Sequence, residues 1–399
     1  MWNKERMTFG VYLFMLLLAI SPAFALGEGN RNLLLIGAMA ISPIFLLRYP
    51  IIIPKIDIPL LCICFMIIMF PLLFHPETMR WSTLMYSCMF CLYFMAYVRI
   101  LIFSNFTFEN FIKLLRGLVF AFCIVLVIQQ FCVLTGLPIF NVSNYNPLEP
   151  WKLNSLMAEP SHTARVLSLL VFIYMITYKQ MTGITSLKEI ILNDKYFFFA
   201  YIYCILTMGS GTAILLLVIL LIGFMPIKNK LNISIYLLLL LSFLYVASHE
   251  IKSINRTSKF IVTLLQFDEK KLISEDLSAA IRIVPTIHGA KSVSIFSIDD
   301  LFGHGVDSDA KLTPLPSVDC GAGSFSIWYN FGFFTAILFW GFCLFICFLR
   351  EKMVMSTFFW LFLCFFYGGL NNQLIWLTLC LFFTYKYLRD GVSDKRILG

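Results

Sequence analysis

The chain has 399 residues, of which 60% are hydrophobic and 13% are charged, and its formal net charge is +8. Soluble domains carry about a quarter charged residues, so this composition excludes an ordinary soluble enzyme. The positive charge is no argument for nucleic acid as a partner, because most of the basic residues flank apolar runs, where they set topology and attract anionic lipid.

Apolar runs that can cross the hydrocarbon core as helices recur along the whole chain. The first run begins like a signal peptide, but eleven further runs favour an uncleaved helix. The sequence therefore predicts an all-α, polytopic membrane protein with about twelve spans. We expect them at 9–26, 33–47, 59–74, 81–103, 117–135, 164–178, 196–209, 211–226, 231–248, 327–349, 353–370 and 373–388.

Basic residues are distributed unevenly between the alternate connections of these spans. One set of connections holds 17 Lys and Arg residues, whereas the alternate short loops hold 4. Basic loops stay in the cytoplasm, so we expect the first set and both chain termini to be cytoplasmic. Two longer outer segments then remain, at 136–163 and 249–326.

The outer segments divide the chain into three parts. Residues 1–248 contain the first nine spans, residues 249–326 form one large outer loop, and residues 327–399 contain the last three spans and a cytoplasmic tail. Within the large loop, "SEDLSAAIRIVPTIHGAK" predicts a helix that begins near Ser274, with Pro285 as a kink or stop.

The cytoplasmic segment "SNFTFENFIKLLRG" has the pattern of an amphipathic interfacial helix. Phe106, Phe111 and Leu115 are among the residues expected to face lipid, while Lys113 and Arg116 meet headgroups.

The stretch "LMAEPSHTAR" gathers several polar residues at the outer entrance of the sixth span. Polar and ionisable residues at membrane depth are costly and tend to mark function. Pro160 disfavours helix at Glu159, so a helix can begin at Ser161 with the carboxylate beside its positive end. We take Glu159 and His162 as candidate catalytic residues. The alternative is a helix cap with a snorkelling Arg165.

The turn "MGSGTAILLL" joins two spans almost without a loop. Its backbone N–H groups and the hydroxyls of Ser210 and Thr212 could bind a phosphate at the start of the next helix. A tight turn with small-residue packing is the alternative, and the sequence alone favours it.

No convincing metal site or disulfide framework appears. Asp307 and Asp309 form a DxD, a pattern that holds a divalent metal in many nucleotide-sugar transferases, but nucleotide sugars are not expected on the outer side. We interpret both residues, together with Asp299 and Asp300, as solvated turns. Eleven of the twelve cysteines lie in apolar runs, where cysteine behaves as a small hydrophobe.

Outward-facing basic groups on a bundle of spans suit a lipid diphosphate as substrate. Arginine binds phosphate with two parallel hydrogen bonds, and the lipid tail fits between helices. A nearby carboxylate or imidazole can take the proton of an attacking sugar hydroxyl. Arg165, Arg256 and Arg282 are the candidate arginines. His304, within a Gly-His-Gly triplet, is a further candidate contact, although a turn histidine is the commoner case.

Four motifs carry a family resemblance: "AEPSHTAR" after the fifth span, the "GSGT" turn, Arg282 on an apolar helix of the outer loop, and "GAGSFSIWYNFGFFTAILF" leading back into the membrane. With these motifs the chain resembles the bacterial O-antigen polymerase (Wzy-type) family, within the group of polymerases and ligases that act on undecaprenyl-diphosphate-linked glycans. The resemblance covers nearly the whole chain as architecture. It implies an all-helical fold similar to the GT-C glycosyltransferases, located in the bacterial inner membrane.

The resemblance also implies a reaction. A growing glycan is transferred from undecaprenyl diphosphate to the terminal sugar of a new lipid-linked repeat unit on the periplasmic face, without a nucleotide sugar and without a cofactor. Donor and acceptor are both undecaprenyl-diphosphate-linked oligosaccharides, and a chain-length regulator protein is an expected partner. We assign catalysis to Glu159, His162 and Arg282. Substrate binding is assigned to Arg165, Arg256, His304, Ser210 and Thr212.

The chain departs from the family pattern at two places. Many relatives carry an arginine in the short turn where this chain has only "GSGT", so the full diphosphate site stays open. Ligases carry a histidine at the end of the long loop where this chain has "CGAGSFS", which argues against the alternative of an O-antigen ligase. A lipid-linked oligosaccharide flippase is the other alternative; it would favour internal repeats and charges deep within spans.

Overall fold

A computed structural model of the chain describes residues 4–20, 33–141, 149–224, 273, 277–310, 312–315, 318–366 and 369–391. The expected span 231–248 and Arg256 lie outside these ranges.

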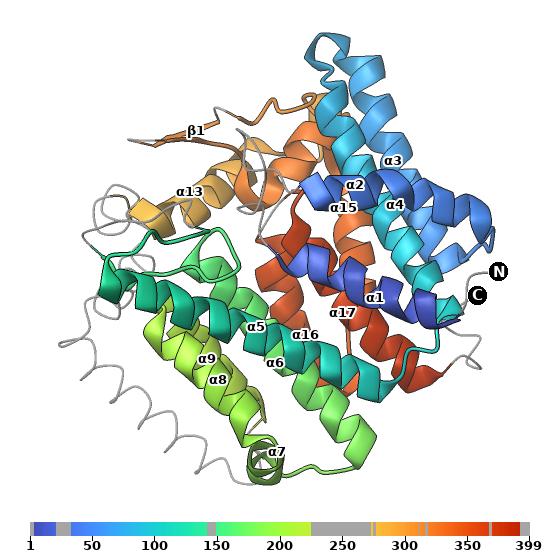
Figure 1. The fold of residues 1–399 in the computed structure, drawn as a ribbon. Helices are drawn as coiled ribbons and strands as arrows, with labels where there is room; N and C mark the ends of the chain where they lie inside the picture. Colours follow the sequence, from blue (N-terminus) through green and yellow to red (C-terminus); the bar gives the residue numbers. More distant parts are fainter. Residues whose placement is uncertain are drawn as a thin grey trace, which may run out of the picture.

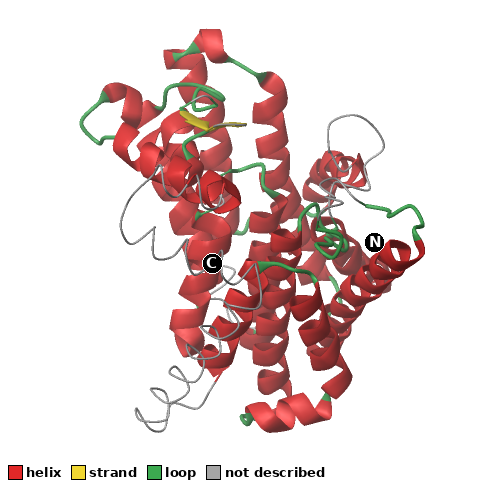
Figure 2. Ribbon diagram, turned by 90° about the vertical axis from the view of Figure 1, so that its left-hand side faces the viewer, coloured by secondary structure: helices red, strands yellow, loops and turns green. Residues whose placement is uncertain are grey.

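The described residues form a helical bundle with one short two-stranded sheet (Figure 1). The sheet and the α3–α4 connection lie toward one end of the molecule, and α7 lies at the opposite end. Figure 2 shows the sheet at the same end from the side. In chain order the elements are α1 (Lys4–Ala19), α2 (Leu33–Arg48), α3 (Pro54–Phe74), η2 (Pro76–Thr78), α4 (Trp81–Phe103), α5 (Phe108–Thr135), α6 (Pro160–Thr182), α7 (Leu187–Asn193), α8 (Lys195–Thr207), α9 (Gly211–Phe224), α13 (Leu277–Ser292), α14 (Ile298–Phe302), β1 (Thr313–Leu315), β2 (Val318–Cys320), η3 (Gly323–Phe325), α15 (Ser326–Cys347), η4 (Arg350–Lys352), α16 (Met353–Trp360), the π-helix η5 (Leu361–Phe365) and α17 (Gln373–Asp390).

Among the described residues, five helical segments are long and apolar enough to cross a membrane: α3, α4, α5, α6 and the segment Gly323–Cys347, which comprises η3 and α15. A sixth is present if α7 and α8, which meet at 98°, are one bent span. The chain is therefore an all-helical protein with the helices of a membrane protein. The expected span 81–103 coincides with α4, whereas the expected span 353–370 is divided into α16 and η5.

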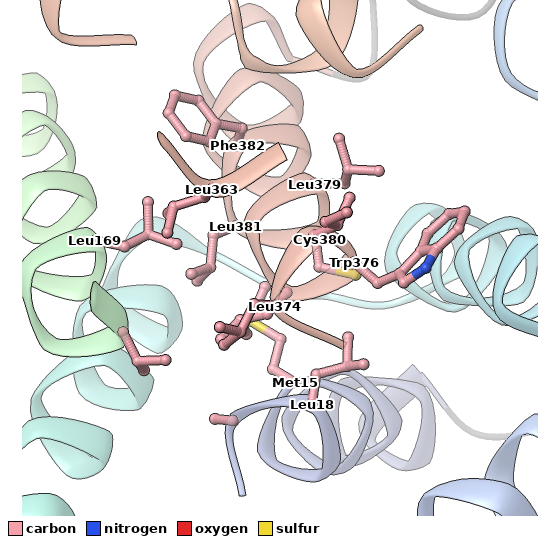
Figure 3. Close-up of a cluster of buried hydrophobic side chains, with 14 of the residues drawn as sticks. Met15, Leu18, Leu169, Leu363, Leu374, Trp376, Leu379, Cys380, Leu381 and Phe382 are labelled. Carbon is pink, nitrogen blue, oxygen red and sulfur yellow. The ribbon is translucent and has the colours of Figure 1, made fainter. Parts of the chain in front are cut away.

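Helix α17 lies at the centre of the packing (Figure 3). It is apolar on all sides and almost every residue from Leu374 to Tyr385 is buried, which is the pattern of a helix surrounded by others. Met15 and Leu18 of α1, Leu169 of α6 and Leu363 of η5 contribute to the cluster drawn around it. This central helix therefore joins the first, middle and last parts of the chain.

The segment 104–117 is not an interfacial helix. Thr107 caps α5 by accepting a hydrogen bond from the Asn110 N–H, and α5 then runs without a break to Thr135. Phe111 and Leu115 are fully buried and Phe106 is 6% exposed. The expectation that these side chains face lipid is wrong, because other helices cover this face.

Helix α13 continues through Pro285, so the expected stop at this residue is wrong. A proline inside a helix removes one backbone hydrogen bond, and the helix tolerates this loss when tertiary packing holds both halves. Ala280 and Val284, which are one helical turn apart, are fully buried, and Ile281 packs against them.

A buried ion pair joins α3, α4 and the segment before α3. The Arg99 guanidinium donates to both carboxylate oxygens of Asp57, at 3.0 and 2.8 Å, and to the carbonyl oxygens of Tyr49 and Ile51. Asp57 also accepts the Ile53 N–H at 2.7 Å. Both side chains are about 95% buried, so the pair persists because its charges and hydrogen bonds are satisfied on both sides.

We predict that Arg99→Met destabilises the protein by about 3–5 kcal/mol, because it leaves the Asp57 carboxylate buried without its cation. The matched control is Arg80→Met, which breaks the Arg80–Asp307 ion pair, where 67% of the arginine side chain is exposed; exposed pairs contribute about 0–1 kcal/mol. Thermal unfolding of both purified variants in one detergent measures the difference. Equal losses would contradict the assigned role of Arg99.

Candidate functional site

The loop that precedes α6 is fixed to the end of α5 by buried polar contacts. Gln129 of α5 accepts the Ser155 N–H at 2.8 Å and donates to the Asn154 side-chain oxygen at 3.3 Å. The Ser155 hydroxyl donates to the Phe122 carbonyl oxygen at 2.6 Å, and the Asn154 amide donates to the Met157 carbonyl oxygen at 2.6 Å. We did not predict this network; its signal is a glutamine within an otherwise apolar run.

This loop delivers Glu159 to the start of α6. Glu159 has extended backbone angles and Pro160 is the first helical residue, close to the expected start. The Glu159 side chain makes no capping hydrogen bond to the helix. Instead it accepts the Ser161 hydroxyl at 3.1 Å and lies 3.9 Å from Nε2 of His162. The carboxylate and the imidazole are 35% and 26% exposed. The structure thus brings the two candidate proton acceptors together, while the Glu159 backbone forms the N-cap of α6.

Arg165 lies one turn further along α6 and is 5% exposed. Its guanidinium carbon is 4.9 Å from the ring centroid of Phe362, within the range of a cation–π contact. The alternative of an arginine that snorkels to solvent is therefore wrong. Phe362 belongs to the π-helix η5, and such bulges are frequent at functional sites.

The "GSGT" turn lies against the loop before Glu159. Gly209 has φ +64°, and a Cβ added to it would be 3.7 Å from the Cα of Lys152. Ser210 is 8% exposed and Thr212 is half-buried in the first turn of α9. Its positive φ shows that Gly209 forms a tight turn, which is one of the two alternatives to a phosphate site. The two hydroxyl residues lie on the same side of the bundle as the Glu159 loop, where the sequence placed substrate binding.

Aromatic contacts lead from the Arg165 neighbourhood to α13. Phe365, on the same π-helix as Phe362, lies 5.9 Å from the ring of Phe325 in η3. Ser324 precedes Phe325, and its hydroxyl lies 3.2 Å from the Thr286 hydroxyl in α13. Position 282 is one helical turn before Thr286; the Arg282 side chain itself lies outside the described part of the structure.

Asp309 is not a solvated turn residue but a buried residue that organises the segment between α14 and α15. It is 7% exposed. Its carboxylate accepts hydrogen bonds from the Ala322 N–H at 2.9 Å, the Ser326 hydroxyl at 2.5 Å and the Asn330 amide at 2.8 Å. The expectation of a solvated Asp309 is wrong because these three donors, all beyond the turn in sequence, surround it. Asp307, by contrast, is partly exposed and accepts from Arg80 and Thr83 of the α3–α4 region.

Asp300 is also buried, at 6% exposure, and the expectation of a solvated turn is wrong here too. One carboxylate oxygen lies 2.9 Å from Nε2 of His304, and the other accepts the Ser294 N–H at 3.0 Å. The His304 ring stacks on Tyr329 at 4.3 Å and keeps 28% of its side chain exposed. A carboxylate that orients a partly exposed imidazole is an arrangement suited to proton transfer. Asp299, by contrast, is exposed, as expected.

Two glycines allow this part of the loop to meet α15. Gly303 has φ +94° and Gly332 has φ +84°, which interrupts the helical angles of α15. A Cβ at Gly303 would clash with the Asn330 backbone, and a Cβ at Gly332 would clash with the Leu301 carbonyl oxygen. Only glycine fits such a close backbone approach at positive φ.

The described residues therefore offer a carboxylate–imidazole pair at the head of α6, a buried arginine one turn further along this helix and a second carboxylate–imidazole pair at α14. Within the same ranges, no group of three or more His, Cys, Asp or Glu residues is arranged to hold a metal ion. No protein-family model, no curated protein and no solved structure matches the chain. The family resemblance thus rests on the sequence motifs alone.

We predict that Asp309→Asn lowers the free energy of unfolding by at least about 2 kcal/mol. Three hydrogen-bond donors now reach the carboxylate, and the NH₂ group of asparagine would face at least one of them without an acceptor. Asp307→Asn is the matched control and is expected to cost less than about 1 kcal/mol, since its side chain is partly exposed and asparagine tolerates the residue's φ of +55°. Thermal unfolding of the two purified variants measures both effects. If Asp309→Asn unfolds like the wild type, the carboxylate does not organise the loop.

Proposed function

We propose that the chain is a surface-polysaccharide (O-antigen) polymerase of the bacterial inner membrane. The observation that carries the proposal is the Glu159–His162 pair at the head of α6, with the buried Arg165 one turn behind it. A base and a fixed cation side by side suit glycosyl transfer from a lipid diphosphate, in which a hydroxyl loses a proton and a diphosphate leaves.

The proposed reaction forms one glycosidic bond and breaks one. A hydroxyl of the terminal sugar on the acceptor repeat unit attacks the anomeric carbon that joins the donor glycan to undecaprenyl diphosphate. Glu159 takes the hydroxyl proton, with His162 as the alternative base. The bond from the anomeric carbon to the diphosphate oxygen breaks, and the electron pair leaves with undecaprenyl diphosphate. The chain's own residues supply these steps, and no nucleotide sugar or cofactor is consumed.

We assign to the arginines the stabilisation of the negative charge on the departing diphosphate. Arg165 lies 4.9 Å from the Phe362 ring, so its guanidinium is held in place before the substrate arrives. Arg282 on α13 and Arg256 in the same outer loop are the further phosphate ligands in this proposal. Ser210, Thr212 and His304 are proposed to contact the sugars or the phosphates.

The proposed setting is a GT-C-like bundle of about twelve spans. Both chain termini face the cytoplasm, and the large outer loop and the site face the periplasm. The contacts among the described residues are consistent with this arrangement: Lys352 and Arg389 gather at one end of the bundle through Gly223 and Glu351. The Glu159 loop and the "GSGT" turn meet at the other end. The alternating basic connections of the sequence are the support for which end is inside.

We predict that Glu159→Gln and Arg282→Lys collapse long surface polysaccharide to single repeat units. Loss of a general base costs about 10²–10⁴-fold in rate, and lysine keeps the charge of arginine but loses its planar fork. The variants are expressed in a deletion strain together with His162→Asn and Arg165→Lys, which show which base and which phosphate ligand dominate. Electrophoresis of the surface lipid measures chain length, and membrane abundance is checked for each variant.

The empty deletion strain is the control that separates the candidate functions. Loss of a polymerase leaves one repeat unit on the surface lipid, loss of a ligase leaves none, and loss of a flippase strands the units inside. If Glu159→Gln and Arg282→Lys both make normal polymer at normal abundance, the proposed site is wrong.

A further inference from the structure

An apolar turn projects from the outer loop between α13 and α14. Ile295 is 49% exposed, Phe296 is 93% exposed and Ile298 is 66% exposed. Isolated exposed hydrophobic residues are normal, but three within four residues, one of them a nearly bare phenylalanine, form a patch that marks an interaction surface. The turn is built locally, because the Ser294 hydroxyl accepts the Phe296 N–H at 3.2 Å.

The helix that follows this turn is docked on a lipid-facing span. Phe302, at the end of α14, stacks on Phe74 of α3 at 4.5 Å and meets the edge of Phe70 at 5.1 Å. Only a third of the α3 span is buried inside the protein. Its exposed residues include Phe65 at 62% and Leu73 at 70%, which lie on different sides of the helix, as expected of a span that meets lipid tails over much of its surface. The apolar turn thus leads directly into a helix that is docked on this span.

Contacts with the α3–α4 connection fix the depth of the turn. The Val306 N–H donates to the Thr78 hydroxyl at 3.1 Å, and Arg80 donates to Asp307 at 3.3 Å. Arg80 and its neighbour Trp81 are both exposed. Arginine and tryptophan at the end of a span mark the level of the lipid headgroups. Helix α14 is held near that level by Phe302 on α3 and by the residues that follow it, Val306 and Asp307.

We infer that the turn 295–298 is a membrane anchor that inserts Ile295, Phe296 and Ile298 into the leaflet at the α3–α4 end of the bundle. The partner is a phospholipid surface. Apolar side chains at the interface gain free energy by leaving water, and the exposed Lys291 in the last turn of α13 adds attraction for phosphate headgroups. This inference does not depend on the proposed reaction.

The anchor has a consequence for the neighbouring histidine. The Ser294 N–H, two residues before Phe296, donates to the Asp300 carboxylate that holds His304. Insertion of the turn therefore fixes the Asp300–His304 pair at headgroup depth. A substrate carried on a lipid presents its reacting group at the same depth.

The test places the photoreactive residue p-benzoylphenylalanine at position 296 of the full-length protein. Phe296 is 93% exposed, so the larger ring does not disturb packing. The protein is reconstituted into phosphatidylethanolamine–phosphatidylglycerol vesicles and irradiated, and phospholipid adducts are measured by mass spectrometry of the labelled peptide. The same probe at Phe65, on the lipid face of α3, is the positive control. The same probe at Ala310, exposed in the outer loop beyond Asp309, reports unspecific labelling.

We expect a phospholipid adduct yield at position 296 that is comparable to that at 65 and at least severalfold above that at 310. Three results would overturn the anchor. They are no lipid adduct at 296 while 65 reacts, equal yields at 296 and 310, or adducts of position 296 to a second copy of the chain in place of lipid.

Discussion

Charged and amide groups in an apolar helical bundle must find partners within the protein, and this constraint shapes both ends of the bundle. At one end the guanidinium of Arg99 satisfies Asp57 and two backbone carbonyl groups. At the other end Gln129 holds the loop before α6, and Asp309 holds the loop before α15. Each is buried, so each contact works in a low dielectric where an unpaired group is costly. The spans between these ends need only apolar packing, which α17 provides at the centre.

The helices could be predicted from the sequence because an apolar run of span length is a local property. The expected span 81–103 coincides with α4, and the expected start of α6 lies within one residue of Pro160. The GT-C likeness and the count of twelve spans stay predictions. Side-chain environments were harder, because they depend on distant partners. The sequence around Asp309 is typical of a turn, and only the structure shows that Asn330, 21 residues later, donates a hydrogen bond to its carboxylate. The sequence pattern predicts that Phe111 faces lipid, but in the structure other helices bury it.

The candidate site was predictable to a similar extent. Glu159, His162 and Arg165 are near one another because they share the first turns of one helix, which the motif itself specifies. The position of the "GSGT" turn against the same loop, and the Asp300–His304 pair, required tertiary structure. Sequence alone assigned His304 to substrate contact; the structure adds a carboxylate that orients its ring. Glu159, His162 and Arg165 lie at the start of α6, and Asp300 and His304 lie in and just after the short helix α14, so these polar groups lie at the ends of the long apolar helices and in their connections.

The central claim is that this chain, without a nucleotide sugar, joins lipid-linked glycans end to end. The most direct measurement uses the purified protein in detergent, supplied only with undecaprenyl-diphosphate-linked repeat units. We expect a ladder of glycans that grows by whole repeat units, with one undecaprenyl diphosphate released for every bond formed. A folded, monodisperse preparation that leaves the repeat units unchanged, while native membranes containing the same protein polymerise them only when a nucleotide sugar is added, would contradict the account.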